Sequence, residues 1–339
     1  MMTGLERTLN FINGSKIDYL PLHPIIMRFA SAYAGTSYRD FCLNHEDKCT
    51  AMIKCADDFM LDWVTVMSDP YAEGEAFGMK VTYPENRLPQ PADGVLLKDF
   101  GDVDKLRLPD ISQSRRMLER IKEVETFRKR VGGKYFIVGW AEGPMAAYSL
   151  LRGLSDACMD FFDHEDELDG VFRLVTENAK QFIKQQIRSG ADCIGIGDAA
   201  ASQIGPELYQ RFIFPFEKEL VDLIHAEGAL AKIHICGDTS KIQKMMMAAG
   251  FDIIDVDHLV GSVSDFRSSM SEHQVFSGFC DPVEDVLFMN SPETIYNRIR
   301  SDYIDAEGRL IISAGCEIPG ETSIENFTAF CRAARAIKI

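Results

Sequence analysis

Short, almost continuous runs of apolar residues recur along the chain, and longer segments with helical spacing of apolar positions separate them. Runs of this kind are typical of strands buried on both faces of a parallel sheet. They predict eight strands, at residues 19–26, 62–67, 134–140, 192–197, 229–235, 252–256, 274–279 and 309–313. Helices are expected at residues 4–13, 37–58, 112–131, 145–162, 165–189, 205–227, 239–249, 262–270, 282–289, 291–305 and 321–337.

Eight strand–helix units in one chain of 339 residues predict an α/β protein of the (β/α)8 TIM barrel type. The segment 70–111 interrupts this alternation with five prolines and a short strand at 78–83, so we expect an insertion after strand two. A doubly wound sheet with a second domain is the alternative. The barrel is preferred because the strand count is eight and no linker breaks the chain, which predicts a single domain over residues 1–339.

Composition narrows the classes of function. The net charge of −16 argues against a nucleic-acid partner. No apolar run reaches 18 residues and the N-terminus lacks the apolar segment of a signal peptide, so no membrane association is expected. The nine cysteines are scattered and odd in number, which indicates a reducing, cytoplasmic location rather than a disulfide framework.

Polar residues gather where the predicted strands end, and this is the face that carries the active site in TIM barrels. They are Asp69, Glu142, Asp198, His234, Cys236, Asp257, His258, Asp281 and Cys316. Asp198 and Asp281 also precede predicted helices, so each is either a helix N-cap or a catalytic group.

His234 and Cys236 are two residues apart in a predicted strand and therefore point to the same face. Cys316 follows another strand and is the best candidate for a third ligand. Three such ligands leave one position of a tetrahedral zinc ion open, which is typical of a catalytic site. The plainer alternative is a hydrogen-bonded histidine among buried cysteines that act as small apolar residues. Cys280 is either a substitute ligand or a residue lining the barrel.

These motifs resemble the uroporphyrinogen decarboxylase superfamily, and within it the zinc-dependent methylcobalamin:thiol methyltransferases, which include coenzyme M methyltransferases. The zinc motif of that branch is His-x-Cys with a distant Cys, which His234, Cys236 and Cys316 match. The resemblance covers essentially the whole chain. Its supporting stretches are Glu75-Ala-Phe-Gly78, Gly143-Pro144, Gly278-Phe-Cys-Asp-Pro282 and Glu325-Asn326.

The decarboxylases of this superfamily hold a polycarboxylate with a paired-arginine motif, Met-Arg-Gln-Ala-Gly-Arg. The chain has Met27-Arg-Phe-Ala-Ser-Ala32, so only Arg28 is retained. The resemblance matches Asp69 to the acidic residue that binds the pyrroles and Tyr148 to the tyrosine of that site. Cys316 stands where the decarboxylases have a histidine. The missing arginine and histidine argue against porphyrinogen decarboxylation.

The resemblance implies a methyltransferase that moves a methyl group from a methylated corrinoid to a zinc-bound thiol such as coenzyme M. The chain shows no obvious corrinoid-binding domain, so we expect methylcobalamin to be carried by a separate corrinoid protein. Glu142, Asp198, Asp257 and His258 are expected to orient His234 or to contact substrate, and an acidic residue is an alternative occupant of the open metal position. Arg28 either binds an anionic group of the substrate or forms a structural ion pair.

Three other hypotheses remain at this point. The first is a metal-free uroporphyrinogen decarboxylase. The second is a non-catalytic barrel that binds a tetrapyrrole. The third is a redox or structural use of the cysteines, without a metal.

Overall fold

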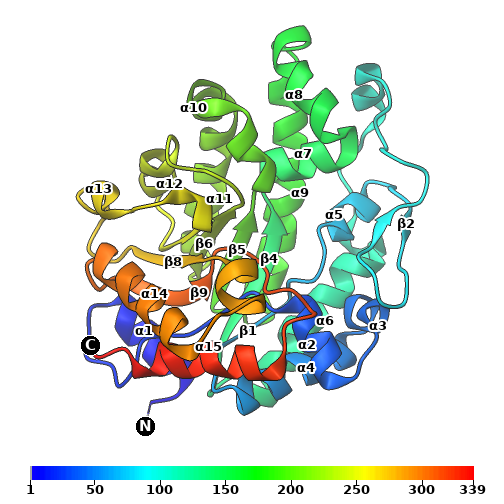
Figure 1. Cartoon of the computed structure of the whole chain (residues 1–339). Helices are drawn as coiled ribbons and strands as arrows, with labels where there is room; N and C mark the ends of the chain where they lie inside the picture. The colour runs from blue at the N-terminus through cyan, green and yellow to red at the C-terminus, as the bar shows by residue number, and fades with distance from the viewer. Residues whose placement is uncertain (1) are drawn as a thin grey trace.

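A curled parallel sheet forms the centre of the protein, whose computed structural model describes residues 2–339 (Figure 1). The strands follow one another in the order β1-β4-β5-β6-β7-β8-β9, and each pair of neighbours is parallel. Their bounds are β1 (Trp63–Thr65), β4 (Phe136–Glu142), β5 (Cys193–Gly197), β6 (Leu230–Ile235), β7 (Ile253–Val256), β8 (Val275–Cys280) and β9 (Leu310–Ala314).

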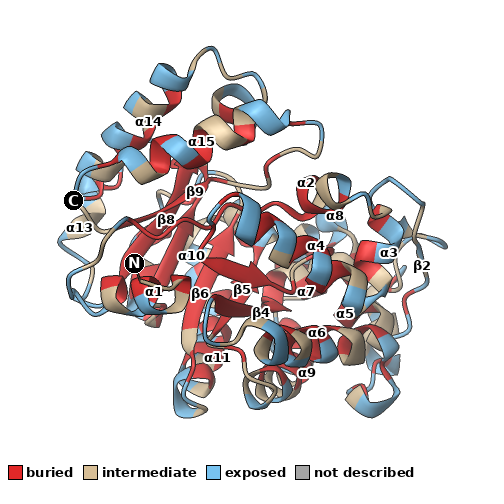
Figure 2. Cartoon of the chain, turned by 90° about the horizontal axis from the view of Figure 1, so that it is seen from below, coloured by how far each residue is buried: buried red, intermediate tan, exposed pale blue. Residues whose placement is uncertain are grey.

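Helices surround this sheet, and they alternate with its strands along most of the chain. Their bounds are α1 (Gly4–Ile12), α2 (Met27–Ala34), α3 (Tyr38–Leu43), α4 (His45–Asp58), α5 (Tyr71–Ala76), α6 (Arg115–Val131), α7 (Pro144–Arg152), α8 (Leu154–Asp163), α9 (Leu168–Arg188), α10 (Gly205–Leu208), α11 (Phe214–Ala226), α12 (Gln243–Ala249), α13 (Ser264–Arg267), α14 (Pro292–Asp305) and α15 (Ile324–Ala336). Figure 2 shows the strands buried at the centre and the helices exposed mainly on their outer sides. The (β/α)8 TIM-barrel-like fold is therefore confirmed.

The first predicted strand, residues 19–26, is wrong as a regular strand. Only an isolated bridge between Leu22 and Ile312 forms there. Pro21 and Pro24 explain this, because proline has no backbone N–H to donate to a ladder. The segment still lies between the first and last strands. Ile312 N–H donates to the carbonyl of Pro21 at 2.8 Å, and Asp62 N–H donates to the carbonyl of Leu22 at 3.0 Å.

Further expectations change in detail, among them those for residues 37–58 and 70–111. The helix predicted over 37–58 is divided into α3 and α4 at Asn44, whose side chain accepts a hydrogen bond from the Glu46 N–H and so caps α4. In the segment 70–111, the expected strand at 78–83 is reduced to β2 (Val81–Thr82). It pairs antiparallel with β3 (Gln90–Pro91), outside the main sheet.

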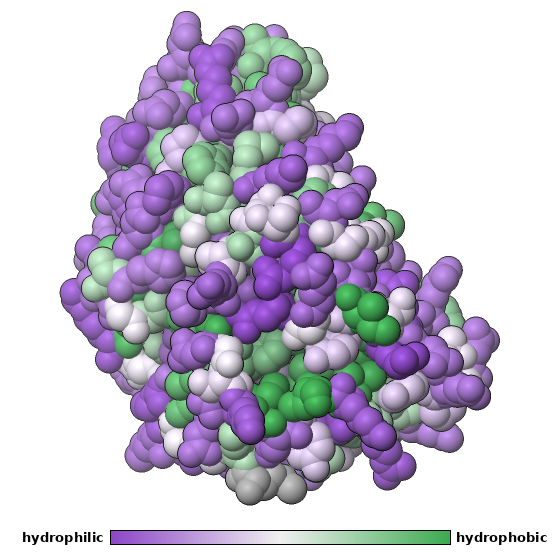
Figure 3. Space-filling view, turned by 90° about the vertical axis from the view of Figure 1, so that its left-hand side faces the viewer, coloured by the Kyte–Doolittle hydropathy of each residue, from purple (hydrophilic) through white to green (hydrophobic). Residues whose placement is uncertain are grey.

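One contiguous cluster of buried apolar side chains joins the sheet to its helices. The strands contribute to it along their whole length, since every residue of β4, β5, β7, β8 and β9 is buried. The face drawn in Figure 3 is mostly hydrophilic, with a smaller hydrophobic area in its lower part. Within residues 2–339, no helix has both the length and the apolar character needed to cross a membrane.

Candidate metal centre

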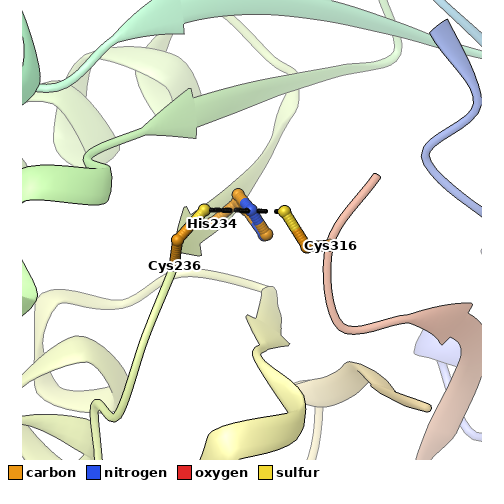
Figure 4. A group of neighbouring side chains, drawn as sticks. All are labelled: His234, Cys236 and Cys316. Atoms are coloured by element: carbon orange, nitrogen blue, oxygen red, sulfur yellow. Dashed lines mark hydrogen bonds between the residues drawn. The ribbon is translucent and has the colours of Figure 1, made fainter. Parts of the chain in front are cut away.

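The structure brings His234, Cys236 and Cys316 together at the carboxyl ends of two strands (Figure 4). His234 lies in β6, Cys236 directly follows that strand, and Cys316 lies in the loop after β9. Their nitrogen and sulfur atoms all fall within 4.8 Å of one another. Among residues 2–339, this is the one group of histidine, cysteine and acidic side chains with metal-binding geometry.

The spacing of these atoms fits a tetrahedral zinc ion. Zinc–sulfur bonds of about 2.3 Å at tetrahedral angles place two sulfur ligands roughly 3.8 Å apart. The Sγ atoms of Cys236 and Cys316 are 3.8 Å apart, and Nε2 of His234 is 3.2 Å from Sγ of Cys236. The sulfur–sulfur distance also exceeds the length of a disulfide, which is about 2.05 Å. The donor set and its spacing fit a zinc ion with one position left open.

A buried ion pair holds the imidazole in place. Asp255 in β7 lies in register with His234, and its Oδ2 is 3.1 Å from Nδ1 of His234. The same oxygen accepts a hydrogen bond of 2.5 Å from Nζ of Lys232. Both charged side chains are almost completely buried. A carboxylate on Nδ1 leaves Nε2 free to bind a metal, which is the usual arrangement around histidine ligands.

Asp255 and Lys232 were missed by the sequence analysis, although the sequence contains a signal for them. Lys232 occupies the same face of β6 as His234, and Asp255 is a lone acidic residue within an apolar strand. A charged residue in the middle of a buried strand requires a partner, because burial of an isolated charge is costly.

These contacts shift the pKa values of the group. Burial opposes ionisation of Asp255, but Lys232 and His234 hold the pKa of its carboxyl well below the usual range. Burial also lowers the pKa of His234, yet hydrogen bonds with Asp255 and Cys316 raise it to about 9. The hydrogen bond from Cys236 lowers the pKa of the Cys316 thiol to about 4. The chain therefore stabilises a thiolate beside the imidazole.

A cavity of about 360 Å³ opens beside the three candidate ligands. Trp140 and Glu142 from β4, Asp69 after β1 and Glu317 after Cys316 form part of its wall. Pockets of 300 Å³ and above accommodate small molecules. We refer to this cavity as the acceptor pocket.

Glu142 is a member of a pair of buried acids. Its N–H donates to Oε2 of Glu73 at 2.9 Å, and its Oε1 accepts a hydrogen bond of 3.2 Å from the indole N–H of Trp140. Burial raises the pKa of Glu73 to about 7, and burial together with the Glu73 charge raises the pKa of Glu142 well above its usual range.

Asp198 is completely buried and does not line the acceptor pocket. It does not cap the turn that follows it. Its Oδ1 instead accepts a hydrogen bond of 2.5 Å from the N–H of Ala146, in the first turn of α7. Burial raises the pKa of Asp198 to about 7, and Glu217 is a buried acid beside it.

Asp257 and His258 lie next to the metal group without joining it. Oδ2 of Asp257 accepts a hydrogen bond of 2.9 Å from the N–H of Gly237 and so fixes the chain just after Cys236. His258 lies between Asp257 and Asp281, with nitrogen–oxygen distances of 2.9 and 3.3 Å. Asp281 also caps the turn after β8, as one of its two predicted roles required.

The structure places the remaining candidates away from the metal group. Asp69 lines the acceptor pocket and forms an ion pair of 2.5 Å with Arg116. Arg28 pairs with Glu321 at 2.6 Å and does not line the pocket. Tyr148 is buried and donates to Asp160. Cys280 is buried with Asp302 as its polar neighbour, at 3.7 Å.

Comparisons with known proteins agree with this architecture. The model of the family described as uroporphyrinogen decarboxylase (URO-D) matches residues 3–337. A methylcobamide:CoM methyltransferase of Methanosarcina mazei is 26% identical over 277 residues, 80% of this chain and 79% of that protein. A Synechococcus uroporphyrinogen decarboxylase is 27% identical over 290 residues, 82% of this chain and 79% of that protein. The solved structure of a methyltransferase from Methanosarcina mazei superposes with a TM-score of 0.86 at 21% identity and covers 98% of each chain.

Proposed function

The chain belongs to the uroporphyrinogen decarboxylase family, and from this premise we propose that it is a zinc-dependent methyltransferase. It transfers a methyl group from a methylated corrinoid to a thiol. The convergence of His234, Cys236 and Cys316 in a tetrahedral spacing carries this proposal. Relatives named as methylcobamide:CoM methyltransferases support it at 26% identity over about 80% of the chain.

Decarboxylation of a porphyrinogen is the rival function, because decarboxylases are relatives of similar identity. The residues disfavour it. Ala32 stands where the decarboxylase motif has its second arginine, and Arg28 pairs with Glu321. A decarboxylase that needs no metal has no use for one histidine and two cysteines with tetrahedral spacing.

The residues around the site have separate roles in the activation of the thiol. A zinc ion bound by His234, Cys236 and Cys316 would lower the pKa of a thiol at the open position, so that the sulfur reacts as a thiolate. Asp255 orients the imidazole through Nδ1, and Lys232 compensates the carboxylate charge. The acceptor pocket holds the remainder of the thiol. The substrate sulfur attacks the methyl carbon, the carbon–sulfur bond forms, and the carbon–cobalt bond breaks with its electron pair left on cobalt.

The methyl donor must approach from outside the barrel. The acceptor pocket, at about 360 Å³, has room for a small thiol but not for a corrin macrocycle. The macrocycle therefore lies across the opening at the carboxyl ends of the strands, and we propose that a separate corrinoid protein delivers it. In-line attack requires the cobalt–methyl axis to point at the sulfur.

Metal content of the purified protein tests the proposal. We expect about one zinc per chain by elemental analysis, and loss of that zinc in Cys316→Ser. Cys158→Ser is the matched control, because Cys158 lies in α8 and takes no part in the metal group. The zinc-loaded protein should consume methylcobalamin in the presence of a thiol, with at least ~100-fold lower activity in Cys316→Ser.

Two results would overturn this function. One is protein that neither contains zinc nor takes it up when zinc is supplied. The other is turnover of uroporphyrinogen without any loss of methyl groups from methylcobalamin.

A further inference from the structure

The charged side chains that line the acceptor pocket are mainly acidic. Within residues 2–339, none of the side chains that line it is a lysine or an arginine. Its ionisable side chains, apart from the three candidate metal ligands and Tyr71, are the acids Asp69, Glu142 and Glu317. A sulfonate or carboxylate on the acceptor would find no cation in this wall, and juxtaposed like charges are costly.

Asp69 already has its counter-ions inside the protein. Arg116 pairs with it at 2.5 Å, and the Nη2 of Arg120 lies 3.8 Å from the same carboxyl oxygen. Burial opposes ionisation of Asp69, but these two guanidinium groups lower its pKa to about 2. Both arginines are buried, and neither lines the acceptor pocket. Arg116 and Arg120 thus compensate the charge of Asp69 without a ligand.

Glu142 and Glu317 are in the opposite situation. In each, one oxygen accepts a hydrogen bond from the protein: Oε1 of Glu142 from Trp140 at 3.2 Å, and Oε1 of Glu317 from the Arg28 N–H at 2.8 Å. Across the described chain, their second oxygens have no hydrogen bond. Burial and the neighbouring Glu73 raise the pKa of Glu142 well above its usual range, and the charge of Arg120 opposes this rise without cancelling it.

Arg28 does not place a positive charge in the wall of the acceptor pocket. Its backbone N–H reaches Glu317, but its guanidinium group turns to Glu321 at 2.6 Å and is absent from the wall. Two carboxyl groups therefore face a pocket whose wall contains no lysine or arginine within residues 2–339, directly beside the position where the acceptor sulfur would bind.

We propose that the acceptor is a small thiol whose tail carries an ammonium group, and that Glu142 and Glu317 receive this group. An acceptor with an anionic tail is disfavoured by the same residues. This inference rests on the proposed methyltransferase function and specifies its substrate class. Hydrogen bonds between a charged donor and a carboxylate are stronger than those between neutral groups. A thiol with an ammonium tail should therefore bind more tightly than a thiol with a neutral tail.

Three thiols that differ only in the tail test this inference. Cysteamine, 2-mercaptoethanol and 2-mercaptoethanesulfonate (coenzyme M) share a two-carbon chain and end in an ammonium, a hydroxyl and a sulfonate group. We expect kcat/KM of the zinc-loaded protein with methylcobalamin to decrease in that order. The ammonium thiol should exceed the sulfonate by at least ~10-fold. Calorimetric titration of the zinc-loaded protein with each thiol should give the same order of affinity without turnover.

Two variants in which a carboxyl group becomes an amide test whether Glu142 and Glu317 cause the preference for the ammonium tail. Glu142→Gln and Glu317→Gln should each reduce the advantage of cysteamine over 2-mercaptoethanol by ~3-fold or more, with zinc content unchanged. Glu272→Gln is the control, because Glu272 is exposed before β8 and far from the pocket lining. It should leave the order of the three thiols unaltered.

The possible failures are distinguishable. If coenzyme M is the best of the three substrates, or if the order is the same in Glu142→Gln and Glu317→Gln as in the parent, the ammonium inference is overturned while the methyltransferase function stands. If none of the thiols demethylates methylcobalamin on zinc-loaded protein, the proposed function itself fails, and the inference fails with it.

Discussion

Asp255 and Glu142 are both buried acids on strands of the same sheet, yet their surroundings shift the pKa values of the two carboxyl groups in opposite directions. Asp255 has the Lys232 ammonium group at 2.5 Å, and the pKa of its carboxyl lies well below the usual range. Glu142 has another acid, Glu73, as its neighbour, and the pKa of its carboxyl lies well above that range. Burial raises both pKa values. Lys232 and His234 then lower the pKa of Asp255, whereas Glu73 raises the pKa of Glu142 further and the charge of Arg120 opposes that rise without cancelling it.

This difference separates two tasks within one site. The β6–β7 side contains its own counter-charge and therefore presents a fixed imidazole to a metal before any substrate arrives. On the β4 side, Glu73 and Glu142 form no ion pair within residues 2–339, and we propose that the ammonium group of a ligand balances this side. Rigid, pre-formed ligands favour metal binding, whereas an incomplete charge balance favours discrimination between substrates.

The largest effect on this contrast is expected from Lys232→Met. The substitution keeps an unbranched apolar stem in β6 but leaves Asp255 buried without its ammonium partner. Removal of one member of a buried ion pair costs about 3–5 kcal/mol of unfolding free energy. Urea denaturation of the zinc-free protein measures this cost. We also expect weaker zinc binding, since a displaced Asp255 no longer orients His234.

The double variant Lys232→Met/Asp255→Asn is the control for Lys232→Met. It removes both charges, so it should recover most of the lost stability, because no uncompensated charge remains in the barrel. It should not recover zinc affinity, since the carboxylate that orients the imidazole is gone. Equal stability of Lys232→Met and the parent would show that the pair does not have the role assigned to it.

The sequence predicted most of the sheet because buried parallel strands have a strong apolar signal. Seven of the eight predicted strands overlap regular strands of the sheet: six of them overlap β4–β9, and the predicted strand 62–67 contains β1. Residues 19–26 differ because two prolines remove the hydrogen-bond donors that a strand needs, although the apolar pattern persists. The pattern of apolar residues therefore predicts which segments are buried more reliably than it predicts the hydrogen bonds that those segments form.

The convergence of His234, Cys236 and Cys316 was predictable for a geometric reason, whereas the pairing of Lys232 with Asp255 was not. Two ligands on one face of a strand and a third at the end of another strand must meet if the sheet curls closed. Lys232 and Asp255 act through a contact across two strands, which depends on register. Sequence spacing carries no information about register between separate strands. The same limit hid the orientation of Arg28 toward Glu321.

Glu73→Gln should change the pH dependence of stability by an intermediate amount. The folded-state pKa of Glu73 is about 7, above its ordinary value of 4.5, so folding favours the neutral carboxyl. The corresponding stability is fully present below about pH 4.5 and is lost as the pH rises through 7. The amide stays neutral, so the variant should gain roughly 3 kcal/mol relative to the parent between pH 4.5 and pH 8.

Urea denaturation of the parent and Glu73→Gln at several pH values gives this difference directly. Glu272→Gln is again the control, since Glu272 is exposed and lies outside the Glu73–Glu142 pair. A pH-independent difference for Glu73→Gln would mean that the Glu73–Glu142 pair ionises as freely in the folded protein as in the unfolded chain.

Arg28→Ala should have the smallest effect, and it tests whether the guanidinium group of Arg28 takes part in recognition of the acceptor. The ion pair between Arg28 and Glu321 is partly exposed, so its loss should cost less than about 1 kcal/mol of unfolding free energy. The backbone N–H that contacts Glu317 is retained in the variant. We therefore expect kcat/KM for cysteamine, 2-mercaptoethanol and coenzyme M to stay within ~2-fold of the parent values. A selective loss of activity toward coenzyme M alone would show that the guanidinium group turns inward to bind the sulfonate, and would remove the contrast between a charge-balanced metal side and an unbalanced substrate side.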